Sequence, residues 1–308
     1  MKMPNKPDLG WSERTIYFQG CNKPIHICTY EKPAKLGFVN PQTNEPYSNV
    51  SNGDAVRIRK IDDRLRISVF DGVTGTPQDD LPDGFTNPAV YAKEKAAELV
   101  AQAPELNNAL IELNSLLHDP KKATRSPNVC VSVADIRFTS ETMSATFTRA
   151  GDCEIYVHTT EEGWTEILPE DMLTQMGRFL YEELKKKCLP EINRIREKLG
   201  MESEEFKQLY IAFAESEEEI LGDPSNWRSL PIGRYSTPIL KHSGLMTVDE
   251  TEIDAIFATS DGPHTSDREP FTEILNKFEH PSDIGSDFFE SRREGWNDMA
   301  AGIVSFAR

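Results

Sequence analysis

The ten residues at positions 66–75, RISVFDGVTG, decide how the rest of the chain is interpreted. They run from a β-type apolar segment directly into Asp71 and Gly72, and a second glycine follows three residues later. One interpretation is a tight turn, because Asp and Gly are common turn residues. The other is a carboxylate held at the end of a strand, where it can bind a metal ion.

The same pattern recurs further along the chain. AIFATS ends in Asp261 followed by glycine, Asn297 and Asp298 directly precede the last apolar run, and Asp54 opens an alternating segment. Such strand ends can bring their oxygens into one small volume if they meet at one sheet edge. Clustered carboxylates raise one another's pKa, and divalent cations remove that cost. Mg²⁺ and Mn²⁺ prefer oxygen ligands, and two of them about 4 Å apart can activate a water for attack on phosphorus.

Composition limits the classes of function. The 308 residues carry a formal net charge of −17, which disfavours binding to nucleic acid or to an anionic membrane surface. No run approaches the roughly 18 apolar residues of a membrane span, and the first residues lack the apolar centre of a cleaved signal. Five scattered cysteines form no CxxC pair. We therefore expect a soluble, cytoplasmic protein with reduced thiols; the residues indicate no oligomeric state.

Hydrophobic periodicity predicts strands and helices in blocks. Short strands are expected at 15–18 and 25–30, a hairpin from DAVRIRKI and RLRISVF, and two helices within 87–118 divided by Pro104. Strands follow at 128–138, 143–150 and 153–159, with RAGD predicted as the turn of a hairpin. A helix is expected from Pro169 to about Met201, either continuous or broken at Pro190, and the last strands are AIFATS and MAAGIVSFA.

Five motifs, in the order SNGDAVRI, RISVFDGVTG, FTRAGDCEIYV, AIFATSDG and WNDMAAGIV, resemble those of the metal-dependent serine/threonine protein phosphatases of type 2C (PPM-type). The resemblance covers residues 50–308 and suggests a divergent member of bacterial or phage-like type. It implies an α+β fold, a four-layer α-β-β-α sandwich of two mainly antiparallel sheets flanked by helices. It also implies one phosphatase-like domain over 1–308, with divergent strands in 1–48 and a helical and loop insertion at about 166–250.

The resemblance also implies roles for particular residues. Asp71 matches the aspartate that bridges two metals, and Gly72 matches the glycine whose carbonyl binds one of them. Asp261 matches the ligand of the Ser/Thr-Asp-Gly motif, so that Asp71 and Asp261 are the expected catalytic residues. Asp54 matches the acidic residue that closes the first motif. Asp152 lies where the family has a Gly-Asp-Ser turn associated with a third, more weakly held metal.

The sequence departs from the family pattern at three places. Gly53 stands where many members have a glutamate that binds the second metal. In the terminal motif, either Asn297 is a neutral ligand or a one-residue slip lets Asp298 bind the metal. The expected phosphate-binding arginine is replaced in register by Asn49, so Arg14 or another basic residue would have to substitute.

The implied activity is hydrolysis of phosphoserine or phosphothreonine in a phosphoprotein substrate, by a hydroxide bridging two Mn²⁺ or Mg²⁺ ions and without a covalent intermediate. An alternative is a catalytically weak relative that binds phosphoproteins or other partners, which the departures at Asn49, Gly53 and Asn297 favour. A small-molecule phosphatase is a third class that the sequence does not separate from the first.

Overall fold

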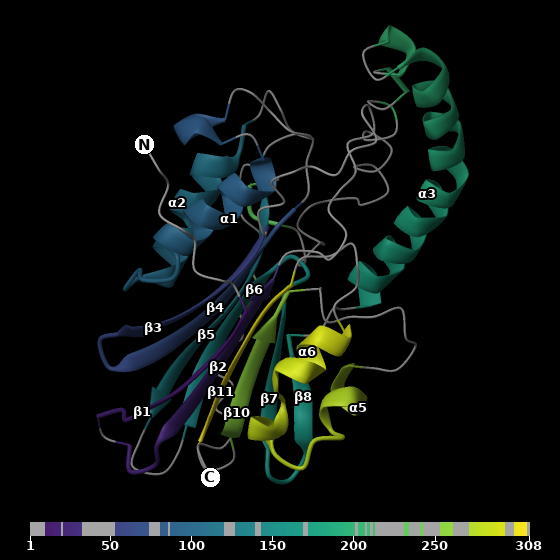
Figure 1. Ribbon diagram of the computed structural model, residues 1–308. Helices are drawn as coiled ribbons and strands as arrows, with labels where there is room; N and C mark the ends of the chain where they lie inside the picture. Colours follow the sequence, from purple (N-terminus) through teal and green to yellow (C-terminus); the bar gives the residue numbers. More distant parts are fainter. Residues whose placement is uncertain are drawn as a thin grey trace. The chain divides into compact units, whose positions relative to one another are not determined.

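Two antiparallel β-sheets form the larger of two compact units in the computed structural model (Figure 1). This unit comprises residues 1–169 and 231–308, and the smaller unit comprises 170–230. The residues that the structure describes are 10–19, 21–32, 53–73, 81–85, 87–119, 127–138, 143–168, 172–200, 203–206, 208–209, 212, 231–233, 241–242, 253–260, 271–292 and 299–306.

The six-stranded sheet has the order β1-β2-β11-β10-β7-β8. Its strands are β1 (Trp11–Ile16), β2 (Ile25–Lys32), β11 (Met299–Phe306), β10 (Ile253–Thr259), β7 (Glu154–Thr159) and β8 (Gly163–Ile167). The five-stranded sheet has the order β3-β4-β5-β6-β9. Its strands are β3 (Asp54–Ile61), β4 (Arg64–Gly72), β5 (Val129–Phe138), β6 (Met143–Ala150) and β9 (Lys241–His242). All pairings between named strands are antiparallel.

The main core lies between the two sheets. Alternate side chains of each strand point to opposite faces, so β4 directs Ile67 and Val69 toward the other sheet and Phe70 away from it. β4 lies between β3 and β5 and is buried on both faces: Leu65, Ile67 and Val69 alternate with Arg66 and Ser68, and these two polar side chains are buried as well. Gly302 of β11 allows a close approach of the sheets, since a Cβ there would lie 2.8 Å from the Val56 side chain.

Helices cover both outer faces (Figure 1). Helices α1 (Pro88–Leu99) and α2 (Leu106–Leu117) pack on the five-stranded sheet. Helices α5 (Phe271–Leu275) and α6 (Ser286–Arg292) pack on the six-stranded sheet, next to the 3₁₀ turn η3 (Pro281–Asp283); a second 3₁₀ turn, η1 (Pro82–Gly84), precedes α1. The predicted α+β sandwich of two antiparallel sheets flanked by helices is therefore confirmed.

The pair α1 and α2 forms as predicted, on either side of Pro104. Asn87 caps α1, because its side chain accepts hydrogen bonds from the backbone N–H groups of Ala89 (2.9 Å) and Val90 (3.4 Å). Arg66 fixes the helix pair to the sheet. Its guanidinium is fully buried and binds Asp135 through two nitrogens at 2.6 and 2.7 Å, and it donates to the carbonyls of Val100 and Ala103, in the segment between α1 and α2. The arginine that begins the decisive stretch thus has a structural role.

One local prediction is wrong. RAGD does not close a hairpin, because β6 belongs to the five-stranded sheet and β7 to the six-stranded sheet. The chain crosses between the sheets at Gly151, whose φ of +81° lies in the left-handed region that glycine adopts without strain. Turn chemistry predicts a change of direction, but it does not decide which strands pair afterwards.

In the smaller unit, helix α3 (Met172–Leu199) runs continuously through Pro190, the unbroken form of the two that the sequence allowed. None of the described helices is long and apolar enough to cross a membrane. The predicted single domain with an insertion at about 166–250 stays a prediction. Strand β8 and helices α5 and α6 were not predicted from the sequence.

Candidate metal centre

Three side chains converge where strands of the two sheets end. The ligand atoms of Asp71, Cys130 and Asp152 all lie within 4.8 Å of one another. Asp71 comes from the end of β4, Cys130 from the start of β5, and Asp152 from the crossing between β6 and β7. The sequence predicted two of these residues, and the fold adds the third.

The strand register explains the convergence. The antiparallel pairing of β4 with β5 sets Asp71 opposite Cys130, and Val131 is paired with Ala150 at the end of β6. Side-chain alternation places Asp71 on the same face of β4 as Ile67 and Val69, toward the space between the sheets. The cluster therefore lies at one end of the main core.

Gly151 is what allows Asp152 to approach Cys130. A Cβ at position 151 would lie 2.3 Å from the Cys130 sulfur, which is closer than any real contact. A residue with a side chain would also be strained at the φ of +81°. This glycine therefore meets both a conformational and a steric requirement of the cluster.

The electrostatics of the cluster favour a cation. Burial raises the pKa of the Cys130 thiol well above its usual value, and the charges of Asp152 and Asp71 raise it further. The Cys130 thiol is also hydrogen-bonded to Asp152, whose Oδ1 is buried without a hydrogen-bond partner. A divalent cation would satisfy that oxygen and offset the gathered negative charge. Two carboxylates suit Mg²⁺ or Mn²⁺, whereas the thiol is a softer ligand than these ions prefer.

Asp54 and Gly72 lie beside the cluster. Asp54 is 3% exposed and paired in register with Asp71 across the β3–β4 ladder, and the Gly72 N–H donates to the Gly53 carbonyl at 3.0 Å. A Cβ on Gly72 would lie 2.2 Å from the Ala89 carbonyl oxygen in the first turn of α1. The glycine is thus required by the close packing of α1, whether or not its carbonyl also binds a metal.

The remaining predicted ligands, Asp261, Asn297 and Asp298, lie outside the described residues, as does Asn49. Two residues close to these ligands in the sequence, Ser260 and Ala300, are hydrogen-bonded to each other. The Ser260 N–H donates to the Ala300 carbonyl at 2.9 Å, and the Ala300 N–H donates to the Ser260 hydroxyl at 3.0 Å. The end of β10 is thereby fastened to the start of β11.

Arg14 does not lie where a substitute phosphate-binding arginine would be needed. It is exposed on β1 and paired with Ile27, five residues before the β2 terminus at Lys32. Five residues of strand span about 16 Å. Lys32 is paired with the first residue of β11 and therefore marks the end of the sheet that carries the start of β7, next to Asp152. The position of Arg14 disfavours this role.

Cys130 is the cluster residue that sequence reasoning missed. CxxC spacing indicates a zinc site and a high cysteine density indicates disulfides. Neither pattern detects a single thiol that lies among carboxylates. A usable signal was present: Cys130 is the third residue of the predicted strand 128–138, at its beginning, and an antiparallel neighbour would place it at the end of RISVFDG. That step needs the pairing of β4 with β5, which the sequence did not supply.

Comparisons with known proteins give the fold a family context. No family model matches the chain, and no curated protein matches its sequence. Among solved structures, RsbX in complex with magnesium is 10% identical with a TM-score of 0.50, the match covering 96% of this chain and 100% of that chain. A bacterial serine phosphatase is 12% identical with a TM-score of 0.51, covering 91% and 97%. At this identity the likeness concerns the fold, and the fold is that of the PPM-type phosphatases, as the sequence motifs predicted.

Proposed function

We propose that this protein is a metal-dependent phosphatase that hydrolyses phosphoserine or phosphothreonine in proteins. The main support for this proposal is the cluster of Asp71, Cys130 and Asp152 at the end of the core between the sheets, in a fold shared with a bacterial serine phosphatase. Carboxylates at that position have a buried oxygen that a cation would satisfy. The structural neighbour RsbX was solved with magnesium, which supports Mg²⁺ or Mn²⁺ as the cofactor.

In this proposal the acidic residues are the metal ligands. Asp71 and Asp152 would hold the cations directly, with Asp54 beside them and Asp261 and either Asn297 or Asp298 completing the set. When bound, two such cations, with a third held more weakly, would supply an activated water and would neutralise charge on the transferring phosphoryl group. The chain itself keeps Asp152 in place through the Cys130 thiol and keeps Asp71 in place through its ladder position.

The formal net charge of −17 bears on the substrate. A phosphoprotein is repelled by this charge at long range, so binding must depend on local positive charge at the candidate metal centre. Cations held by Asp71 and Asp152 would be a source of that charge. We therefore expect affinity for a phosphopeptide to require the metal, and we expect neither nucleic acid nor a membrane as a partner.

The first experiment is hydrolysis of p-nitrophenyl phosphate and of a phosphothreonine peptide with Mn²⁺, with Mg²⁺ and with EDTA. Asp71→Asn should lower the metal-dependent rate by at least about 10²-fold, because it removes a charge aimed at the reacting centre. Asp62→Asn is the matched control: it makes the same change in the β3–β4 turn, where Asn tolerates the φ of 52°. Equal rates in the Asp71 variant and the wild type would exclude this assignment.

A weak or inactive phosphatase that binds phosphoproteins or other partners is the second candidate. Two observations favour it: Gly53 offers no side chain where the family has a glutamate, and a protonated thiol occupies the cluster. Absence of turnover, together with absence of Mn²⁺ binding by calorimetry, would support this candidate. Metal binding without turnover would instead place the defect in phosphate binding, consistent with the position of Arg14.

A further inference from the structure

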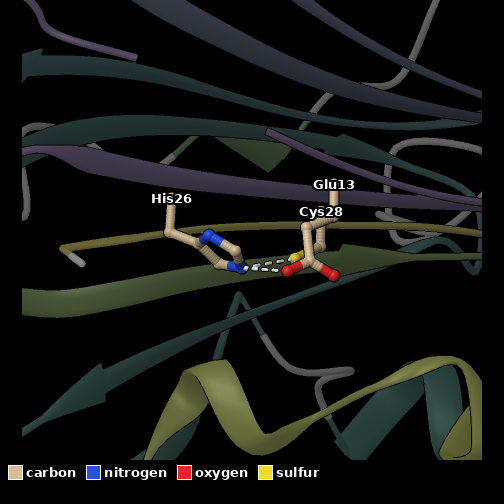
Figure 2. A group of neighbouring side chains, drawn as sticks. All are labelled: Glu13, His26 and Cys28. Atoms are coloured by element: carbon tan, nitrogen blue, oxygen red, sulfur yellow. Dashed lines mark hydrogen bonds and ion pairs between the residues drawn. The ribbon is translucent and has the colours of Figure 1, made fainter. Parts of the chain in front are cut away.

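A second group of possible metal ligands lies on the six-stranded sheet, away from the candidate metal centre. The ligand atoms of Glu13, His26 and Cys28 are all within 4.8 Å of one another. The Cys28 sulfur is 3.0 Å from Nε2 of His26, and the same nitrogen is 3.9 Å from Oε1 of Glu13. Figure 2 shows the imidazole nitrogen, the sulfur and the carboxylate directed toward one common point.

Two adjacent strands build this group. His26 and Cys28 are two residues apart on β2 and therefore project from the same face, and Glu13 of β1 is paired in register with Cys28. Cys28 packs in the cluster beneath α5 and α6, so this is the outer face of the sheet. The intervening Ile27 points into the core between the sheets.

The side chains are held in place by their neighbours. The Trp11 indole N–H donates to Oε2 of Glu13 at 2.9 Å, which leaves Oε1 facing His26. The Trp11 ring packs against Phe289 of α6, with 5.8 Å between the centroids. The carboxylate is thus oriented by a hydrogen bond of the kind that supports ligands in metal sites.

The three side chains differ in their exposure to solvent. Cys28 is 2% exposed, the His26 side chain 15% and the Glu13 side chain 54%, so an ion can enter from the Glu13 side. Ser305 of β11 is paired with His26 and shares its face, and its hydroxyl is buried without a hydrogen-bond partner. An unsatisfied buried hydroxyl is costly, and it would be satisfied by a ligand or a water of a site formed here.

We propose that Glu13, His26 and Cys28 bind one Zn²⁺ ion on the outer face of the six-stranded sheet. Zn²⁺ is bound by thiolate, imidazole and carboxylate in tetrahedral sites, with distances that put ligand atoms about 3.4–3.6 Å apart. The two separations here, 3.0 and 3.9 Å, lie on either side of that value. The Cys28 proton passes to solvent when the sulfur binds the ion, and a fourth position stays open to water.

A cysteine nucleophile activated by histidine is the competing interpretation. Burial, together with the charge of Glu13, raises the pKa of Cys28 to about 12, so the thiol is not a thiolate at neutral pH without a cation. A nucleophile must also reach a substrate, whereas Cys28 is almost completely buried. Both features suit a ligand that is deprotonated by the metal itself.

The proposed zinc site is separate from the candidate metal centre. Cys28 is four residues from the β2 terminus, about 13 Å along the strand, and it faces away from the space between the sheets. The ligand types differ as well, since Mg²⁺ and Mn²⁺ prefer oxygen whereas a thiolate selects Zn²⁺. A bound Zn²⁺ would fasten the edge strand β1 to β2 and stabilise the fold.

The test uses Co²⁺ as a spectroscopic substitute for Zn²⁺ in the full-length protein after treatment with a chelator. One equivalent should give a thiolate-to-cobalt charge-transfer band that one equivalent of Zn²⁺ abolishes. Cys28→Ser should remove the band. Cys130→Ser and Cys21→Ser are matched controls and should retain it, because Cys130 belongs to the other cluster and Cys21 lies outside both.

Two further variants keep the proposal testable if Cys28→Ser does not fold. Glu13→Gln changes a half-exposed side chain and should weaken Zn²⁺ binding, measured by calorimetry, by at least about tenfold. Asp71→Asn should leave Zn²⁺ binding unchanged, which separates this site from the proposed phosphatase. The proposal is overturned if the wild type gives no band, if Cys130→Ser removes it, or if Glu13→Gln binds Zn²⁺ as tightly as the wild type.

Discussion

Asp71 and Cys130 stand opposite each other in the β4–β5 ladder, and Asp152 reaches the same point from the crossing between the sheets. The relationship places a protonated thiol among carboxylates at the candidate metal centre. Oxygen ligands favour hard cations, and sulfur favours soft ones. The centre should therefore differ from an all-oxygen site in its response to thiophilic ions.

That difference can be measured with Cd²⁺. In the wild type, Cd²⁺ should bind at Cys130 and inhibit Mn²⁺-dependent hydrolysis. Cys130→Ser should raise the inhibitory Cd²⁺ concentration by at least about tenfold while retaining activity with Mn²⁺, because the hydroxyl keeps a hydrogen-bonding group beside Asp152. Equal inhibition of both proteins would show that the thiol does not take part in metal binding.

Gly72→Ala should destabilise the protein, because the new Cβ would lie 2.2 Å from the Ala89 carbonyl oxygen and the first turn of α1 would have to move. A cost of about 1–3 kcal/mol is expected for such overpacking, and thermal denaturation would register it as a lower Tm. Gly285→Ala is the control, since a Cβ at that position would meet nothing within 4 Å. A Tm equal to that of the control would mean that α1 adjusts without cost.

The terminal motif can be tested by two substitutions outside the described residues. If Asn297 is the ligand, Asn297→Asp should tighten Mn²⁺ binding by about tenfold or more, because a charged oxygen replaces a neutral one. If Asp298 is the ligand, Asp298→Asn should abolish that binding. Calorimetric titration of both variants distinguishes the two registers, and unchanged affinity in both would remove the motif from the site.

His158 should make stability dependent on pH. Burial lowers its pKa from 6.5, the nearby His280 lowers it further, and Asp254, whose carboxylate is 3.5 Å from Nδ1, opposes the shift. The unfolded chain therefore binds the proton first as pH falls. The stabilising contribution is complete above pH 6.5 and is lost as pH falls through the lowered pKa.

His158→Gln should accordingly flatten the decrease in Tm between pH 7 and pH 5, while His118→Gln, on the same unit, serves as the control. The expected effect is a smaller slope rather than a uniform change, because neutral glutamine does not titrate. An unchanged slope would indicate that Asp254 compensates fully for the burial of the imidazole.

The local sequence pattern predicted many of the strands and helices. The β3–β4 hairpin, the division of α1 from α2 at Pro104, and the strands β5, β6, β7, β10 and β11 follow from periodicity and turn residues, which act over a few positions. The pairing of strands, in contrast, joins residues that are far apart in the sequence. Whether β6 pairs with β7 depends on which sheet each joins, and a glycine with positive φ at position 151 is compatible with a hairpin and with a crossing.

The sequence by itself determined that Asp71 ends an apolar strand, that Asp54 opens one, and that Asp152 follows a turn glycine, because residue type and spacing are local properties. The tertiary structure alone decided that Cys130 lies among the carboxylates and that Glu13 meets His26 and Cys28. Both groups are assembled by strand register. Register follows from the burial of whole sheet faces, to which residues from distant parts of the chain contribute together.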